Sequence, residues 1–108
     1  MSNMSIALKY YSPEALEEFA EETSTHLGAI TSYIAYTGKW DKDDYDEAFC
    51  GRMDRDELAD YLVTAFVDAH NISETVVGYL DDDKIVRDAL LEGFYYYDDE
   101  AEVLFYVV

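Results

Sequence analysis

Acidic side chains are the residue class in this chain that is abundant enough to carry chemistry. The sequence holds 25 Asp and Glu residues among 108. Carboxylates can act as the acid and nucleophile of glycoside hydrolysis, as calcium ligands, or as a fixed array of negative charge. Among so many carboxylates some pair will always have a catalytic spacing, so such a pair is uninformative. The pattern of the carboxylates must therefore decide between these roles.

The acidic runs do not fit a calcium-binding loop of the EF-hand type. Such a loop needs acidic or amide ligands at positions 1, 3 and 5, Gly at position 6 and Glu at position 12. Counted from Asp41, positions 5 and 12 are Tyr45 and Arg52. Counted from Asp81, position 5 is Ile85. Weak binding of cations at the surface stays open, and we expect no metal site.

The other reactive residue types form no catalytic pattern. Cys50 is the sole cysteine, so no intramolecular disulfide exists, and we interpret it as a half-buried structural thiol. His26 and His70 have no zinc-helix spacing and are interpreted as surface or helix-end residues. The sequence has no phosphate-binding or dinucleotide-binding glycine motif. We therefore predict that the protein is not an enzyme and uses no cofactor.

The charge balance favours a basic partner. Seven Lys and Arg against 25 Asp and Glu give a formal net charge of −18. Such an excess is typical of disordered chains, but 11 Tyr, 5 Phe and an apolar fraction of 50% indicate a folded core. Self-repulsion in a folded acidic body costs stability. Nucleic acid, anionic membranes and acidic substrates are poor partners for it, whereas a basic surface is a natural one.

The first element that positions carboxylates is a predicted helix from Pro13 to about Thr25. Ser12 followed by Pro13 is a typical helix start. Leu16, Phe19, Ala20, Thr23 and Leu27 share one side of this helix. All five of its glutamates fall on the other side: Glu14, Glu17, Glu18, Glu21 and Glu22.

The sequence before and after this helix predicts a mixture of helices and short strands. Residues 5–11 are expected to form a short strand or an extended lead-in. Gly28 is expected to break the helix, and residues 29–36 form a second helix or a short strand, with the helix favoured. Residues 37–39 make a turn, and residues 41–47 hold the densest acidic run beside Trp40. Residues 48–53 are expected to form a strand.

Three further helices are expected after residue 53. Asp54 and Glu57 form a capping box for the first, whose apolar stripe is Leu58, Leu62, Ala65 and Ala69. Ser73 can cap a second short helix that runs through Tyr79. Asp81 can cap a third, which Gly93 ends in a left-handed turn.

The chain is expected to end in a hairpin. Residues 94–97 and 102–108 are rich in aromatic and β-branched residues, and residues 98–100 between them supply turn chemistry. Tyr95, Tyr96 and Tyr97 alternate faces in a strand, so at least one is exposed or meets a partner. The fold class is therefore α+β, mainly helical with a small antiparallel sheet that includes a C-terminal hairpin.

The order of motifs after residue 48 resembles the C-terminal domain of the ArdA antirestriction family. The matching features are Phe49 with Gly51, the acidic helix from Asp54, Ile72-Ser73, Tyr79-Leu80-Asp81 and Arg87-Asp88. The resemblance covers about the last 60 residues. The acidic helix after Tyr11-Ser12-Pro13 matches the family's middle domain more loosely, and its N-terminal domain has no counterpart in these 108 residues. We therefore expect a helical subdomain over residues 1–40 and an ArdA-like α+β subdomain over residues 41–108.

The resemblance implies a DNA mimic from a phage or mobile element that inhibits type I restriction-modification enzymes. Such an inhibitor occupies the DNA-binding groove of the specificity and methyltransferase subunits. The family also implies a homodimer. The alternative is an acidic adaptor that binds a basic protein surface outside any DNA groove. In either case we expect no direct nucleic-acid binding.

The spacing of the carboxylates agrees with mimicry. Residues three or four positions apart on a helix lie about 5–6 Å apart, while each DNA strand carries a phosphate every 3.4 Å or so. At the charge density of a duplex, −18 corresponds to about 30 Å, or roughly 9 base pairs. The residues predicted to imitate phosphates are Glu14, Glu17, Glu18, Glu21, Glu22, Asp41, Asp43, Asp44, Asp46, Glu47, Glu57, Asp60, Asp68, Asp81, Asp82 and Asp83.

The expected location is the cytoplasm of a bacterial host. No run of 18 apolar residues exists, and the first residues lack the basic and apolar stretches of a signal peptide. A lone cysteine also suits a reducing compartment.

Overall fold

The computed structural model describes residues 2–107, which fall into two compact units. Unit 1 covers residues 1–50 and unit 2 covers residues 51–108. The sequence placed a division between residues 40 and 41, so unit 1 extends ten residues beyond that point. The extra residues contain helix α4 (Lys42–Ala48), which contacts α2 (Pro13–Thr23). Each unit is described by itself below.

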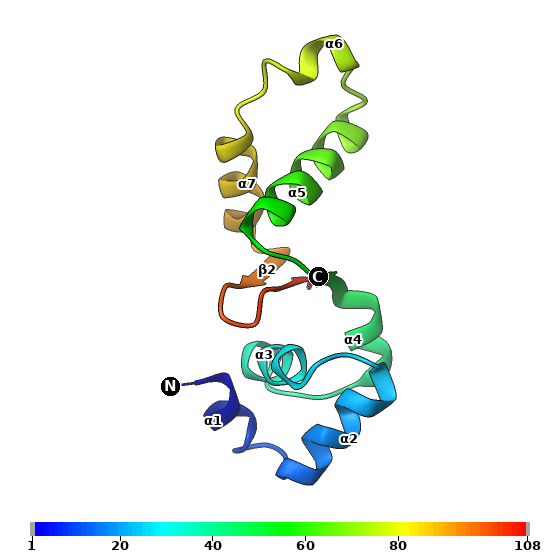
Figure 1. The fold of residues 1–108 in the computed structure, drawn as a ribbon, viewed down its shortest axis with the longest axis vertical. Coiled ribbons are helices and arrows are strands. Elements are labelled where there is room, and N and C mark those ends of the chain that lie inside the picture. The colour runs from blue at the N-terminus through cyan, green and yellow to red at the C-terminus, as the bar shows by residue number, and fades with distance from the viewer. Residues whose placement is uncertain (1, 108) are drawn as a thin grey trace. The chain divides into compact units, whose positions relative to one another are not determined.

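Unit 1 is built from four helices (Figure 1). They are α1 (Asn3–Ala7), α2, α3 (Leu27–Thr37) and α4. The Ser12 hydroxyl accepts a hydrogen bond from the Ala15 amide at the start of α2, and Pro13 occupies the first turn, as predicted. Gly38, with a φ of +77°, ends α3 in the left-handed conformation that glycine adopts easily.

Helix α3 forms the core of unit 1. Six consecutive residues, from Ala29 to Ile34, are buried, which is the pattern of a helix covered on every side. Helices α1 and α2 both pack against it. Among the covering residues, Ala7 of α1 and Leu16 of α2 are fully buried. The predicted helix over residues 29–36 is therefore confirmed.

Two details of the sequence prediction for unit 1 are wrong. Residues 5–11 do not form a strand, because the Ser2 hydroxyl caps a short helix, α1, whose buried Ala7 packs on α3. Gly28 does not end helix α2. Helix α2 ends at Thr23, and Ser24 after it takes a left-handed conformation with φ +54°. Gly28 lies in the first turn of α3.

Unit 2 contains the three helices expected after residue 53. They are α5 (Arg55–His70), α6 (Glu74–Val77) and α7 (Asp82–Leu91). The capping box at the start of α5 is present in full: Asp54 accepts from the Glu57 amide, and Glu57 accepts from the Asp54 amide. Asp81 caps α7 through the Lys84 amide. Ser73 lies at the cap position of α6 but makes no side-chain cap bond there.

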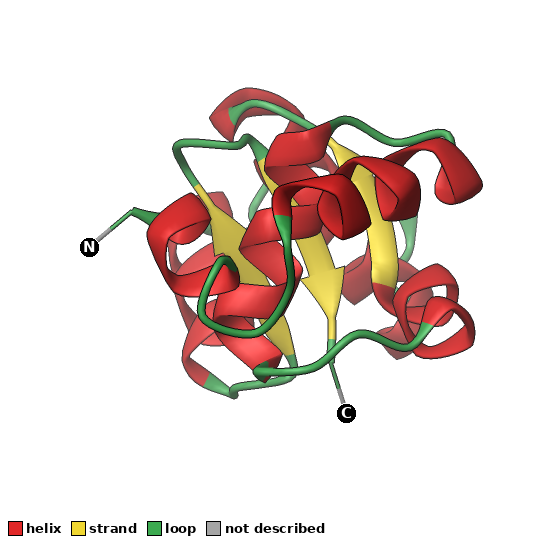
Figure 2. Cartoon of the chain, turned by 90° about the horizontal axis from the view of Figure 1, so that it is seen from below, coloured by secondary structure: helices red, strands yellow, loops and turns green. Residues whose placement is uncertain are grey.

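The strands are β1 (Phe49–Arg52), β2 (Tyr95–Asp98) and β3 (Val103–Tyr106), and they form one sheet in the order β1-β3-β2 (Figure 2). Strands β2 and β3 form the predicted antiparallel hairpin, with Tyr96 opposite Phe105. Asp98 is buried and accepts from the Glu100 and Ala101 amides, which shapes the turn. Val103, Leu104 and Phe105 are fully buried. The three tyrosines of β2 are all half-buried.

The predicted fold class is confirmed. Helices dominate, and the small sheet includes the C-terminal hairpin. Within residues 2–107, none of the helices combines the length and the apolar character that crossing a bilayer requires.

Candidate partner-binding surface

The five glutamates of α2 form an exposed face, which we call the α2 glutamate face: Glu14, Glu17, Glu18, Glu21 and Glu22. The opposite side of the same helix buries Leu16 and half-buries Phe19 and Thr23. Within residues 2–107, none of the five carboxylates accepts a hydrogen bond or forms an ion pair. The predicted segregation is therefore present, and these carboxylates are neither hydrogen-bonded nor ion-paired in the described chain.

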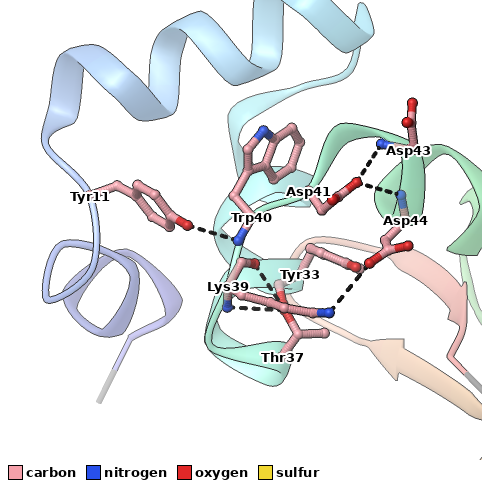
Figure 3. A network of polar contacts seen from close by, with 8 residues as sticks. All are labelled: Tyr11, Tyr33, Thr37, Lys39, Trp40, Asp41, Asp43 and Asp44. Carbon is pink, nitrogen blue, oxygen red and sulfur yellow. Dashed lines mark hydrogen bonds and ion pairs between the residues drawn. The ribbon is translucent and has the colours of Figure 1, made fainter.

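The carboxylates around α4 are exposed, but unlike those of α2 most of them form capping hydrogen bonds or ion pairs. Asp41 caps the helix and accepts from the amides of Asp43 and Asp44 at 3.0 and 3.1 Å (Figure 3). Lys39 Nζ lies 3.3 Å from Asp44, and Lys42 Nζ lies 2.9 Å from Asp46. In the described chain, only the carboxylates of Asp43 and Glu47 in this group make neither a hydrogen bond nor an ion pair. Part of the predicted array is thus used in capping or neutralised.

An aromatic cluster lies beneath these two acidic helices. Phe19 of α2 stacks on Trp40, with ring centroids 4.5 Å apart and planes 10° apart. Trp40 also contacts Tyr45 of α4 at 5.0 Å, and Tyr11 meets the edge of Phe19 at 5.2 Å. The Tyr11 hydroxyl accepts a hydrogen bond from the Trp40 amide at 2.9 Å (Figure 3). Such ring contacts add stability beyond the area they bury, and they tie α2 to α4.

Tyr45 is the buried link between the two helices. Its side chain is fully buried, and its hydroxyl donates to Thr25 Oγ1 at 2.9 Å. Burial raises the pKa of Tyr45 to about 12; the nearby Asp46 charge adds to the rise, and the Thr25 bond opposes it. Burial likewise raises the pKa of Tyr33, with further contributions from the Asp44 and Asp41 charges. These phenols therefore stay neutral beside the acidic surface.

The electrostatics of Lys42 connect the α2 glutamate face with α4. Its hydrogen bond to Asp46 is the main cause of the raised pKa of Lys42, and the charges of Asp43 and Glu22 raise it further. Glu22 belongs to α2, so acidic groups of both helices act on this α4 lysine.

The predicted carboxylates of unit 2 are also exposed, in several different settings. Glu57 and Asp81 serve as helix caps. Asp60 and Asp68 line a shallow depression on α5 together with Tyr61. Asp82 and Asp83 lie in the first turn of α7, where negative charge is favourable to the helix dipole. These residues form several small groups rather than one face.

Exposure alone does not separate the predicted carboxylates from the others. Of the 25 acidic residues, all within the described chain, only Asp98 is buried. The sequence prediction omitted exposed acids such as Asp88 of α7, Glu92 after it, and Glu100 and Glu102 of the hairpin turn. What distinguishes the α2 glutamate face is the regular helical spacing of five carboxylates that make no hydrogen bond and no ion pair in the described chain, and the sequence pattern revealed that spacing.

Arg55 of unit 2 forms a bidentate ion pair with Asp99 and lies over the ring of Tyr97. Its Nε and Nη2 atoms donate to the two Asp99 oxygens at 2.8 Å each, and its guanidinium lies 5.8 Å from the Tyr97 ring centroid. The bond to Asp99 raises the pKa of Arg55. Tyr97 in turn donates to the Met53 carbonyl at 2.9 Å. This arrangement fixes the start of α5 to the hairpin.

The histidines and the cysteine lie outside any cluster suited to a metal. His70 is at the C-terminal end of α5, as expected, whereas His26 occupies the N-terminal cap position of α3. Cys50 is half-buried, and its thiol donates to the Ala48 carbonyl. Within the part of the chain that the structure describes, no group of three or more His, Cys, Asp or Glu side chains could hold a metal ion.

Comparison with known proteins gives no relative for this chain. No protein family, curated protein or solved structure matches it.

Proposed function

We propose that this protein is a DNA mimic that inhibits type I restriction-modification enzymes by occupying their DNA-binding groove. The observation that carries the proposal is the α2 glutamate face, whose five exposed carboxylates make no hydrogen bond and no ion pair in the described chain. Between Glu14 and Glu22 the helix rises by about 12 Å, and along this length a DNA strand carries three to four phosphates or so. The charge density of the face is therefore comparable to that of one strand.

The aromatic cluster of unit 1 supports the same proposal. The stacked Phe19 and Trp40 and the buried Tyr45 hold α2 and α4 together. A charge array held rigid before binding avoids an ordering cost when the partner arrives. The motif resemblance to the ArdA family supplies the class of target, namely the specificity and methyltransferase subunits of a type I enzyme in the bacterial cytoplasm. The protein performs no chemistry in this mechanism.

Inhibition kinetics test the proposal. The methylation rate of a purified type I methyltransferase would be measured at several concentrations of DNA and of this protein. Because one groove receives either DNA or the mimic, the inhibition should be competitive, with the apparent inhibition constant rising in proportion to DNA concentration. Inhibition that DNA does not relieve would contradict the proposal and favour an acidic adaptor that binds elsewhere. The absence of inhibition for several type I enzymes would reject this target class.

A further inference from the structure

Unit 2 has a groove between α5 and α7, with a volume of about 440 Å³. Its apolar walls come from residues three and four positions apart on each helix, so each helix contributes one face. We call it the α5–α7 groove, and its apolar lining includes Leu62, Ala65, Phe66, Ala69, Ile85 and Ala89.

The apolar lining of the groove is only partly covered by the chain itself. Helix α5 buries just Leu58 and Leu62, and α7 buries none of its residues. Phe66 and Ile85 remain half-buried, and Ala69 is exposed. In the described chain this pair of helices therefore presents a contiguous apolar surface to solvent, and such surfaces commonly mark interaction sites.

Two carboxylates lie beside the apolar lining. Asp88 of α7 and Glu92, which follows α7, line the groove and are exposed. On the other side of α5, Asp60 and Asp68 line the depression that shares Ala65 with the groove. Residues 51–108 hold 15 acidic and 4 basic side chains, a formal charge of −11. Unit 2 is therefore strongly negative as a whole, and Asp88 and Glu92 bring this charge to the α7 side of the groove.

Lys84 and His70 are the basic groups of the lining. His70 lies with its ring 4.2 Å from that of Phe66, and its Nδ1 is 2.9 Å from the Phe66 carbonyl oxygen. A carbonyl only accepts hydrogen bonds, so Nδ1 carries the proton and the ring is held in place. In sequence, Lys84 lies near the start of α7, and Glu92 follows its last residue. The charge of the lining therefore changes along α7, from positive at Lys84 to negative at Asp88 and Glu92.

We propose that the α5–α7 groove binds an amphipathic helix of a partner protein with Lys or Arg residues on both sides of its apolar stripe. The lining runs from Leu62 to His70 and from Lys84 to Glu92, eight helical steps in each case, or about 12 Å. That length accommodates anchors at positions i, i+4 and i+7 of a bound helix. The basic residues face the carboxylates beside the groove and are concentrated toward Glu92.

A second copy of this chain is a poorer occupant on electrostatic grounds. Two copies joined through this groove would bring two strongly negative units together, and like charges across an interface are unfavourable. The proposal does not depend on DNA mimicry, because it uses no residue of the α2 glutamate face.

The test uses a fluorescent synthetic peptide of about four helical turns, made of Leu at helical spacing and Lys elsewhere. Its binding to the full chain is measured by anisotropy. Ala69→Trp fills the groove from an exposed helix position and should weaken binding by about tenfold or more. Thr75→Trp, on exposed α6 outside the groove, is the matched control and should leave binding unchanged. The double variant Asp88→Asn/Glu92→Gln should weaken binding at about 50 mM salt, and the difference should vanish near 500 mM.

Each alternative outcome overturns the proposal. A Glu-for-Lys version of the peptide that binds equally well would remove the charge argument. Undiminished binding to Ala69→Trp, with the fold verified by circular dichroism, would exclude the groove. If that variant does not fold, binding to Asp88→Asn/Glu92→Gln that equals the native level would exclude it instead. Failure of the peptide to bind, together with self-association that Ala69→Trp abolishes, would assign the groove to a second copy. The α2 glutamate variant described below should bind the peptide normally, so the two proposals can fail separately.

Discussion

Neutralising the α2 glutamate face should make the protein more stable and a weaker inhibitor. The perturbation is the fourfold variant Glu17→Gln, Glu18→Gln, Glu21→Gln and Glu22→Gln. With Glu14, these glutamates form five pairs spaced three or four residues apart, and each like-charge pair destabilises a helix by about 0.2–0.5 kcal/mol. None of the five carboxylates has a hydrogen bond or an ion pair to lose in the described chain.

The magnitudes can be estimated from these pairs. Removing all five repulsions should raise the free energy of unfolding by about 1–2 kcal/mol, or about 4–8 °C in Tm for each kcal/mol. Four lost contacts to a basic groove, at about 0.5 kcal/mol each, should weaken inhibition by about thirtyfold. The assays are thermal unfolding by circular dichroism and inhibition of a type I methyltransferase.

The matched control changes the same number of charges elsewhere: Glu74→Gln, Glu92→Gln, Glu100→Gln and Glu102→Gln. All four positions are exposed and lie in unit 2. The control should lower inhibition much less than the α2 variant. If both variants lose inhibition equally, net charge matters and the arrangement of α2 does not. If the α2 variant loses stability and keeps full inhibition, the face is a structural surface and the reasoning is refuted.

Three further predictions concern stability and assembly. Because the pKa of Tyr45 is raised to about 12 in the folded state, the stability that its burial contributes is present in full below pH 10 or so and is lost as the pH rises through 12. Tyr45→Phe should flatten this alkaline loss of stability in pH-dependent denaturation, and an unchanged profile would contradict the linkage. Phe19→Ala removes the stack on Trp40 and should cost about 2–3 kcal/mol in urea unfolding followed by Trp40 fluorescence, whereas a cost under 1 kcal/mol or so would show that the cluster does not hold α2. Light scattering at low micromolar concentration should give about twice the chain mass of 12.4 kDa if the Tyr-rich C-terminal region mediates the expected homodimer. A monomer at every concentration would exclude that assembly.

Local signals in the sequence predicted most of the helices and strands. The capping box of Asp54 and Glu57, the Ser12-Pro13 start and the Asp81 cap are each encoded within four residues, and all three are present. The hairpin follows from β-branched and aromatic residues on either side of an acidic turn. Helix α1 could not be predicted in this way, because a helix of five residues is stabilised mainly by packing on α3.

The candidate surface was predictable in part. A period of three and four residues placed the five glutamates on one side of α2, and the structure has them there. The ion pairs of Lys39 and Lys42 were not evident, although Lys42 and Asp46 have the i, i+4 spacing that allows one. The α5–α7 groove depends on how two helices far apart in sequence pack, which no local pattern specifies.

The most direct test of mimicry is the displacement of labelled DNA from a type I methyltransferase complex as salt concentration rises. If carboxylates occupy the phosphate positions of the groove, adding this protein should release the DNA, and the protein itself should bind no DNA. A folded acidic protein has fewer condensed counterions than a duplex, so its affinity should fall less steeply with salt than that of DNA. Displacement should therefore become more efficient at higher salt. A stable ternary complex of enzyme, DNA and this protein, with DNA affinity unchanged, would contradict the mimic mechanism.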